Sequence, residues 1–420
     1  MKTKPDWLII LIYIIMICVG WFSIYATSYQ PDSFTMKSQY GYQLIWIGIS
    51  LLLALFSYVL TQNVYKNISL ILYILFSLML VAVIFVGAEH KGAKSWVGIG
   101  NIGIQPAEFA KYATCLLVSK YVSDNNCNLT EWKYLWKVGL IIAIPIFIIL
   151  LQNDTGSALP YIFLVFALFR EGMSSWFLII GSVAILLFCM LMYLPQWAVL
   201  LMVIGILIFL LVRNRKHKKT YKAIILIFIV VVSYVLSVDM IYNKVLQPHQ
   251  KQRIELLFGK IDDPRGIGYN VNQAKIAIGS GGMWGKGFCS GTQTQLKYVP
   301  EQTTDFIFCT IGEEKGFVGT TFVIVLYMLL IGRIILLAEA NQDAFVRVYG
   351  YCVACIFFAH FAINIGMTIG LMPVIGIPLP FISFGGSSLL AFTIMLFTFI
   401  NVESKSHGYE VNPTGWSQWN

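Results

Sequence analysis

The run WLIILIYIIMICVGWFSIYA, from Trp7 to Ala26, is twenty residues long and contains no charge. A helix of about 20 apolar residues is long enough to cross the hydrocarbon core of a bilayer. The run is too long for the core of a signal peptide, and no A-x-A cleavage site follows it. We therefore predict a retained first membrane span.

The composition extends this interpretation to the rest of the chain. Hydrophobic residues make up 58% of the sequence and charged residues 12%, whereas an average soluble domain is about 25% charged. The apolar runs lack the period-2 alternation of barrel strands, so they indicate helices. The predicted fold class is all-α, a polytopic membrane helix bundle of about 10–12 spans. Their approximate bounds are 7–27, 41–61, 66–88, 105–120, 136–152, 155–170, 174–193, 196–213, 221–243, 315–337, 348–371 and 385–401.

The basic residues predict an orientation, because cytoplasmic loops are enriched in Lys and Arg. The densest basic run, RNRKHKKTYK (Arg213–Lys222), is expected in the cytoplasm, which places both termini inside and Gln247–Lys315 outside. We predict one membrane domain at 1–403, with a large extracytoplasmic loop at about 246–314. A polar cytoplasmic tail is expected at 404–420.

The outer loop is polar, glycine-rich and basic. A basic surface there suits an anionic partner such as a lipid diphosphate, although a solvated face near anionic headgroups explains any single lysine equally well. The net charge of +9 is ordinary for a membrane protein, and no nucleic-acid motif, zinc-ligand cluster or nucleotide loop is visible. We expect no nucleic-acid partner. The basic residues of the loop are Lys251, Arg253, Lys260, Arg265, Lys275, Lys286 and Lys297.

Two polar stretches lie next to predicted helix starts. In KGAKSWVGIGNIGIQPAEFAK, residues 91–111, a glycine-rich loop leads into a proline suited to a first helical turn. Glu108 and Lys111 then lie three residues apart, and they either shape a cavity wall or form a salt bridge that fixes the helix. In QNDTGS, residues 152–157, Asp154 either caps a helix beginning near Thr155 or lines an outward-facing cavity.

Two further stretches belong to the outer loop. In GYNVNQAKIAIGSGGMWGKGF, residues 268–288, a helix is expected before glycines that make either a phosphate-binding turn or a plain tight turn. In YVPEQTTDFIFCTIGEEKGFVG, residues 298–319, Asp305 precedes Phe-Ile-Phe. Such apolar neighbours would raise the pKa of a carboxyl group and favour a general base. A capping or ion-paired acid is the alternative. The other acids there are Glu301, Glu313 and Glu314.

The last stretch, NIGMTIGLMPVIGIPLPFISFGGSS, residues 364–388, contains three prolines before the final span. Irregular backbone at membrane depth is tolerated where it is buried in protein or lines a cavity, so we predict a cavity wall. The default role of Ser383, Ser387 and Ser388 is to satisfy freed backbone groups. His360, on an apolar helix, is expected to be a hydrogen-bonded core residue rather than a ligand.

Taken in order, these stretches resemble the SEDS family of bacterial cell-wall proteins, and its rod-shape branch most. The matching elements are Trp96 followed by QPAEFAK, then QNDTGSAL, the GYNVNQAKIAIGSGG–GKG run, GTQTQLKYVPEQTTDFIF–IGEEKGFVG, and the proline-rich stretch. The resemblance covers nearly the whole chain. One such element alone is weak evidence, because a short motif can match by chance. Five matching elements in the family's order are a specific signal.

The resemblance implies a peptidoglycan glycosyltransferase of the bacterial cytoplasmic membrane, active in cell elongation. Its substrate would be lipid II, an undecaprenyl-diphosphate-linked disaccharide pentapeptide, polymerised at the outer face. Its partners would be a class B penicillin-binding protein and other elongation-complex membrane proteins. Asp305 matches the proposed catalytic aspartate of the family's PEQ-x-TDFIF motif. The residues expected to bind substrate or line its cavity are Glu108, Lys111, Asp154, Lys275, Lys286, Lys297, Glu301, Gln302 and Ser387.

The implied chemistry needs a base for the acceptor hydroxyl and cations for the departing diphosphate. Asp305 would supply the base, and Lys275, Lys286 and Lys297 the positive charge, with or without a divalent cation such as magnesium or manganese. No cofactor is firmly implied, and the sequence names no metal ligand. Three alternatives stay open: a septal homologue of the same activity, a lipid II flippase, and a non-catalytic scaffold for a penicillin-binding protein.

The chain departs from the family pattern in two ways. First, four positions carry other residues than the family usually has. The family usually has His at Thr303, Pro at Asn153, Leu at Thr155 and Ser at Ala107. None of these changes removes a carboxylate, and the threonine at 303 argues against a base at that position. Second, Ser174–Arg213 supplies what looks like two helices beyond the family's usual ten.

Overall fold

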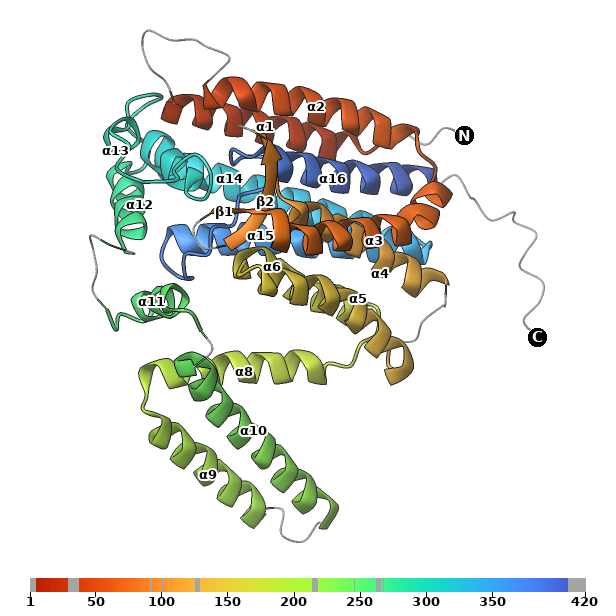
Figure 1. Cartoon of the computed structure of the whole chain (residues 1–420), viewed down its shortest axis with the longest axis vertical. Helices are drawn as coiled ribbons and strands as arrows, with labels where there is room; N and C mark the ends of the chain where they lie inside the picture. Colours follow the sequence, from red (N-terminus) through yellow and green to blue (C-terminus); the bar gives the residue numbers. More distant parts are fainter. Residues whose placement is uncertain are drawn as a thin grey trace, which may run out of the picture. The chain divides into compact units, whose positions relative to one another are not determined.

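The helices of the computed structural model correspond to the twelve predicted spans (Figure 1). The structure describes residues 5–28, 38–90, 93–99, 102–124, 129–213, 218–244, 246–261, 266 and 268–406. The corresponding helices are α1 (Trp7–Ser28), α2 (Gln39–Val59), α3 (Gln62–Val86), α4 (Pro106–Asp124), α5 (Trp132–Leu151), α6 (Thr155–Ile162) with α7 (Leu164–Arg170), α8 (Trp176–Tyr193), α9 (Gln196–Arg213), α10 (Lys218–Lys244), α14 (Ile307–Ala340), α15 (Ala344–Thr368) and α16 (Gly386–Ser406).

The polytopic all-α prediction is confirmed. Ten helices in the described part of the chain are long and apolar enough to cross a membrane. The two predicted spans that fall short are α4, which carries Glu108, Lys111 and Lys120, and the pair α6–α7. Proline lacks the backbone N–H and disturbs the turn before it, so Pro160 accounts for the short α6.

The chain forms two compact units, residues 1–173 with 270–420, and residues 174–269. In the second unit, α8, α9 and α10 pack through the buried side chains of Leu187, Val199 and Val235. The two helices predicted within Ser174–Arg213 are therefore present as α8 and α9. The same unit contains α11 (Pro248–Leu257), while α12 (Tyr269–Ser280) and α13 (Thr292–Gln295) belong to the remainder of the predicted outer loop.

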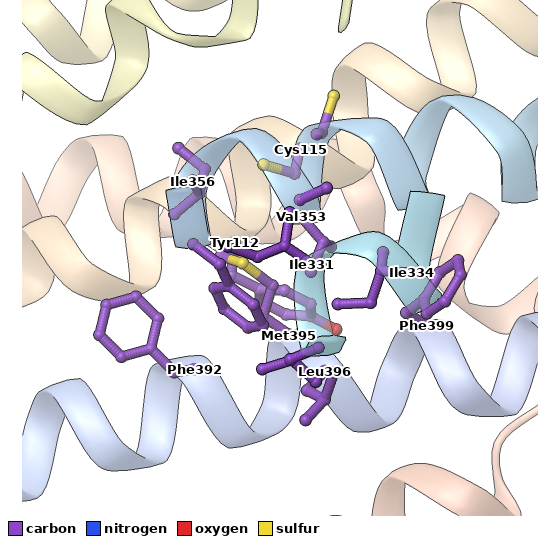
Figure 2. Packing of buried hydrophobic residues seen from close by; sticks show 14 of the residues in the cluster. Tyr112, Cys115, Ile331, Ile334, Val353, Ile356, Phe392, Met395, Leu396 and Phe399 are labelled. Atoms are coloured by element: carbon purple, nitrogen blue, oxygen red, sulfur yellow. The ribbon is translucent and has the colours of Figure 1, made fainter. Parts of the chain in front are cut away.

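The core of the first unit lies around α15 and α16. Within the most apolar window of each of these helices, 78% is buried, compared with 22% for α2 and α3. These two helices also have the lowest mean hydropathy of the candidate spans, 1.7 and 1.5, because a helix surrounded by protein can bury polar side chains that find hydrogen-bond partners there. Figure 2 shows α4, α14, α15 and α16 contributing side chains to one packed cluster, among them Tyr112, Ile331, Val353 and Phe392.

The glycine-rich stretch before α4 forms strands where the sequence predicted a loop. The strands β1 (Ala88–His90), β2 (Ala93–Ile99) and β3 (Ile102–Ile104) pair antiparallel in the order β1-β2-β3. A Cβ on Gly103 would lie 2.9 Å from the Trp96 ring, so glycine lets the ring cover the neighbouring strand. Gly103, one of the glycines that indicated a loop, therefore allows close packing between strands.

The glycines after α12 bring the chain against the start of α14. Gly316 has φ 64° and kinks α14, which frees backbone groups for pairing outside the helix. The Lys286 and Gly287 N–H groups donate to the carbonyl groups of Glu313 and Glu314, at 2.9 and 3.1 Å. A Cβ on Gly281 would lie 2.0 Å from the Gly312 oxygen. These glycines therefore serve a close approach to the protein's own helix.

Gly281→Ala is expected to destabilise the protein by about 1–3 kcal/mol, because the new methyl group would overlap the α14 backbone. Gly279→Ala is the matched control, since a Cβ there meets nothing within 4 Å. Thermal unfolding of the purified protein should show a lower midpoint for Gly281→Ala alone. Equal midpoints for the two variants would contradict the packing described.

Candidate active site

Asp305 lies in the turn that leads into α14 and is half-buried. Its Oδ2 atom lies 3.2 Å from the position that a Cβ on Gly376 would occupy, and Gly376 itself has φ 79°. Glycine is suited to this position both by its conformation and by the close approach. The carboxylate thus lies directly against the irregular segment between α15 and α16, which the sequence predicted as a cavity wall.

Asn364, on α15, fixes the backbone on both sides of this contact. Its Nδ2 atom donates to the carbonyl oxygen of Asp305 at 2.8 Å and to that of Ile377 at 2.7 Å. The side chain is fully buried. One amide group therefore joins the turn that carries the carboxylate to the segment that the carboxylate touches.

Further hydrogen bonds anchor the residues just before Asp305. The Phe384 N–H donates to the Thr303 carbonyl at 2.8 Å, and the Ser383 hydroxyl donates to the Thr304 carbonyl at 2.5 Å. The same hydroxyl accepts from the Leu379 N–H at 2.8 Å. Ser383 thus satisfies backbone groups freed by the prolines, as its default role predicted.

Glu301 and Gln302 differ in exposure. Glu301 is exposed, has φ 59°, and accepts from the Thr304 hydroxyl at 3.1 Å. Gln302 is buried, and its Nε2 atom donates to the Thr294 carbonyl at 2.9 Å. Glu301 is therefore accessible to a ligand, whereas Gln302 holds α13 against the turn before α14.

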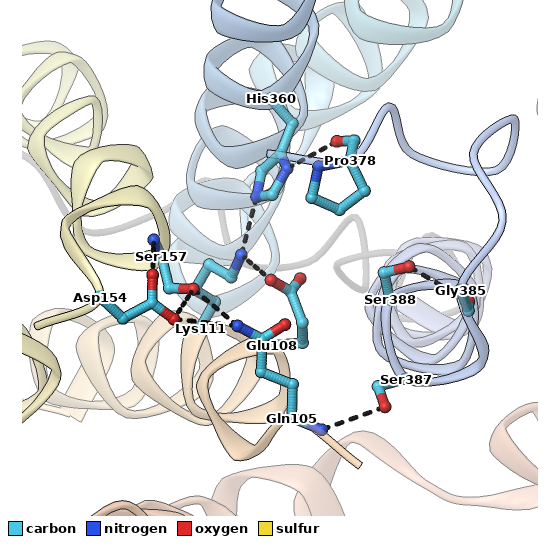
Figure 3. A network of polar contacts seen from close by, with 10 residues as sticks. All are labelled: Gln105, Glu108, Lys111, Asp154, Ser157, His360, Pro378, Gly385, Ser387 and Ser388. Atoms are coloured by element: carbon cyan, nitrogen blue, oxygen red, sulfur yellow. Dashed lines mark hydrogen bonds and ion pairs between the residues drawn. The ribbon is translucent and has the colours of Figure 1, made fainter. Parts of the chain in front are cut away.

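Asp154 is the N-cap of α6, which confirms the capping alternative (Figure 3). Its Oδ1 atom accepts from the Ser157 N–H at 3.0 Å, and its Oδ2 atom accepts from Gln105 Nε2 at 3.0 Å. A Cβ on Gly156 would lie 2.9 Å from the Ile375 oxygen. The start of α6 therefore packs one residue away from the Gly376 contact with Asp305.

Glu108 and Lys111 form the salt bridge that the sequence allowed, at 2.8 Å, with exposures of 2% and 0% (Figure 3). Lys111 Nζ also lies 2.7 Å from His360 Nε2. Because an ammonium group only donates, Nε2 accepts, and Nδ1 donates to the Pro378 carbonyl at 3.1 Å. His360 is thus a hydrogen-bonded core residue, as predicted. These residues connect α4 through α15 to the proline-rich segment.

The three lysines assigned to the diphosphate have different surroundings. The Lys275 ammonium lies 2.4 Å from where a Cβ on Gly370 would be, so it lies over the start of the proline-rich segment. Lys286 pairs with buried Glu313 at 2.7 Å, and Lys297 is exposed. Glu313 also accepts from the backbone of α13, so Lys286 has a structural partner. The diphosphate role of all three stays a prediction.

Ser387 also serves the backbone. Its hydroxyl donates to the Gly103 carbonyl at 3.2 Å. The same hydroxyl accepts from the Gln105 N–H at 3.1 Å (Figure 3). This bond joins the start of α4 to the start of α16. The predicted residues that this geometry brings around the segment between α15 and α16 are Asp305, Asp154, Lys111 and Lys275. Lys286 instead lies with Glu313 beside α13.

The protein side chains at this site supply too few ligands to hold a divalent cation by themselves, so a substrate would have to supply further ligands. In the described part of the chain, no group of three His, Cys, Asp or Glu residues could hold one ion. Magnesium in phosphate-processing sites commonly uses one or two carboxylates together with phosphate oxygens and water. Asp305 and the exposed Glu301 are carboxylates available for that arrangement, so a substrate diphosphate would have to complete the coordination.

Asn364 is the residue that the sequence reasoning missed. Asn364 opens the stretch of residues 364–388, in which the sequence analysis assigned roles to the prolines and serines but none to Asn364. A polar residue within a membrane span is a functional-site candidate by default, and that signal was available. Its two carbonyl partners lie 59 and 13 residues away in the chain, so no local pattern could have named them.

The polar residues described above form a site at one end of a bundle of membrane helices. The whole chain is similar to proteins of a known family. A profile of the FtsW/RodA/SpoVE family, described as "Cell cycle protein", matches residues 6–199 and 182–408. Peptidoglycan glycosyltransferase MrdB of Escherichia coli K12 is 33% identical, with 93% of this chain and 90% of that protein covered. Peptidoglycan glycosyltransferase RodA of Treponema pallidum is 30% identical, with 91% and 94% covered.

Solved structures agree on the fold. A chain from "Structural coordination of polymerization and crosslinking by a peptidoglycan synthase complex" has a TM-score of 0.70 at 24% identity, covering 96% of this chain and 99% of that one. The Thermus thermophilus rod shape determining protein RodA has a TM-score of 0.63 at 23% identity, covering 97% and 99%.

The chain belongs to the FtsW/RodA/SpoVE family, also called SEDS. It is a peptidoglycan glycosyltransferase, and a multi-pass protein of the bacterial cytoplasmic membrane. Division-type and sporulation relatives match over similar lengths, with the Bacillus subtilis stage V sporulation protein E at 28% identity and a Geobacter FtsW at 26%. Relatives named for sporulation and division are therefore nearly as similar to this chain as the RodA relative.

Proposed function

We propose that this protein polymerises lipid II into glycan strands at the outer face of the membrane during cell elongation. The observation that carries the proposal is the Asp305 carboxylate held against Gly376, on a turn fixed by Asn364. The GTQ…VPEQ and IAIGSGG stretches resemble the rod-shape branch most, and two of the relatives described above carry the names RodA and MrdB, which favours elongation. The orientation deduced from the basic residues puts the segment before α14 outside.

In the proposed reaction, Asp305 takes the proton from the acceptor sugar's 4-hydroxyl group. The resulting oxygen attacks the anomeric carbon of the lipid-linked strand, and undecaprenyl diphosphate departs with inversion at that carbon. The Lys275 ammonium, over Gly370, and exposed Lys297 stabilise the negative charge of the departing diphosphate. A divalent cation, if one is bound, would add positive charge at the same oxygens.

A class B penicillin-binding protein is the proposed partner. The supporting observation is the similarity of the fold to a chain from a complex in which polymerisation and crosslinking are coordinated. A glycan strand released near the membrane surface is the substrate that a crosslinking enzyme needs. The two activities would therefore gain from being held together.

The proposed function is tested with the purified protein and labelled lipid II, with and without the partner. Formation of long glycan products would support the enzyme assignment, and lipid II movement across liposomes without polymer would contradict it. Depletion of the protein in its native bacterium distinguishes the elongation branch of the family from the division branch. Loss of elongation with rounded cells supports the proposal, whereas filaments with blocked division would assign the protein to the septal branch.

Asn364→Leu is expected to lower the polymerisation rate at least about 10-fold, because two buried carbonyl groups lose their donor and the Asp305 turn is released. Asn401→Leu is the matched control. Asn401 is equally buried and its Nδ2 atom also donates to two carbonyl groups, Ser57 and Leu60, both at 2.7 Å. Rates are compared at saturating lipid II, after both variants are checked for folding. Equal rates for the two variants would show that Asn364 has only a structural role.

A further inference from the structure

An apolar groove of about 780 Å³ lies between α1 and α14. Its walls include Phe22 of α1 and Val318 and Phe322 of α14, and none of the residues placed above in the candidate active site lines it. Both helices are candidate membrane spans. In a bilayer, such a groove is filled by a lipid chain or by another helix.

The mouth of the groove carries the residues expected at a membrane interface. Trp284, from the glycine-rich turn, lines it and is 79% exposed, and Phe288 lies beside it. Tryptophan is enriched where hydrocarbon meets headgroups. The groove therefore extends from headgroup level along the two helices.

Glu314 and Lys315 are adjacent residues that line this groove with opposite charges. Glu314 is only 3% exposed, and its Oε1 atom has no hydrogen-bond partner among the residues that the structure describes. The exposed Lys315 ammonium lies 5.1 Å from the centroid of the Phe288 ring. A buried carboxylate oxygen without a donor is costly, so an occupant that brings a donor is favoured.

The side chains of Glu314 and Lys315 determine which lipid headgroup fits the groove. A polyprenyl diphosphate would bring several negative charges beside Glu314, which repels them, and only Lys315 would attract them. A quaternary choline group carries positive charge but no N–H to donate. A primary ammonium group next to a phosphate group complements both side chains at once.

We propose that the groove is a binding site for a zwitterionic phospholipid with a primary ammonium headgroup, of the phosphatidylethanolamine type. Its acyl chain lies along Phe22, Val318 and Phe322, its ammonium group donates to Glu314, and its phosphate group accepts from Lys315. The site is separate from catalysis, so it stands or falls independently of the proposed function.

The test measures lipid retention by the full-length protein, using native mass spectrometry. The protein is titrated with phosphatidylethanolamine, phosphatidylcholine and phosphatidylglycerol carrying identical chains. We expect about 10-fold preferential retention of the ethanolamine lipid over the choline lipid, because a hydrogen bond to a charged group is lost with choline. Glu314→Gln removes the negative charge but keeps an acceptor oxygen, so it should weaken this preference.

A second pair of variants tests the groove itself. Val318→Trp should fill it and remove the retained lipid, whereas Val325→Trp should not. Val325 lies on the same helix with nearly equal exposure, 46% against 44%, but does not line the groove. Equal retention by these two variants would overturn the location. Equal retention of the three lipids, preference for the anionic lipid, or a preference unchanged by Glu314→Gln would overturn the headgroup assignment.

Discussion

Asp305→Asn should reduce lipid II polymerisation by about 10²–10⁴-fold, the range expected when a positioned general base is lost. Asparagine has nearly the same shape as aspartate, so it should still fit beside Gly376. The Asn364 hydrogen bond goes to the Asp305 backbone carbonyl and does not depend on the carboxylate. The loss should therefore fall on the rate of reaction, with the fold preserved.

The measurement is the initial rate of polymer formation from labelled lipid II by purified protein, at matched concentrations of folded enzyme. Asp239→Asn serves as the control, because Asp239 is an exposed aspartate on α10 whose Oδ1 atom accepts from Asn243 Nδ2 of the same helix at 2.9 Å. Asp239→Asn should retain the parent rate. Polymerisation by Asp305→Asn at the parent rate would remove Asp305 from the role of base.

Lys111→Met should destabilise the protein by about 3–5 kcal/mol, because it leaves Glu108 as an uncompensated buried charge. Lys111 and Glu108 are almost completely inaccessible. The substitution also removes the donor to His360 Nε2. Urea or thermal unfolding of the purified protein should show the loss directly. An unfolding free energy equal to that of the parent would contradict a buried, charged pair.

The double variant Glu108→Gln with Lys111→Met separates stability from function. Replacing a buried ion pair by neutral groups often costs little, so most of the stability lost in Lys111→Met should return. If activity returns with it, the pair fixes the helix, which is one of the two roles that the sequence left open. If stability returns while polymerisation stays low, the charges also act on the substrate cavity.

Local sequence patterns predicted the helices and several polar contacts correctly. The apolar runs placed the spans, because about 20 apolar residues satisfy both the backbone and the bilayer. Asp154 was placed as a possible helix cap because capping depends only on the next few residues. The Glu108–Lys111 pair was visible for the same reason, since residues three apart on a helix are neighbours.

The sequence alone determined that this chain is a bundle of membrane helices with one polar, glycine-rich region before α14, and it singled out Asp305. Only the tertiary structure decided what surrounds that residue. The contacts of Asp305 with Asn364 and Gly376, and of Lys111 with His360, join residues 59 to 249 positions apart in the chain. Such pairs arise when separate helices pack, and helix packing depends on the shapes of whole surfaces rather than on any local spacing.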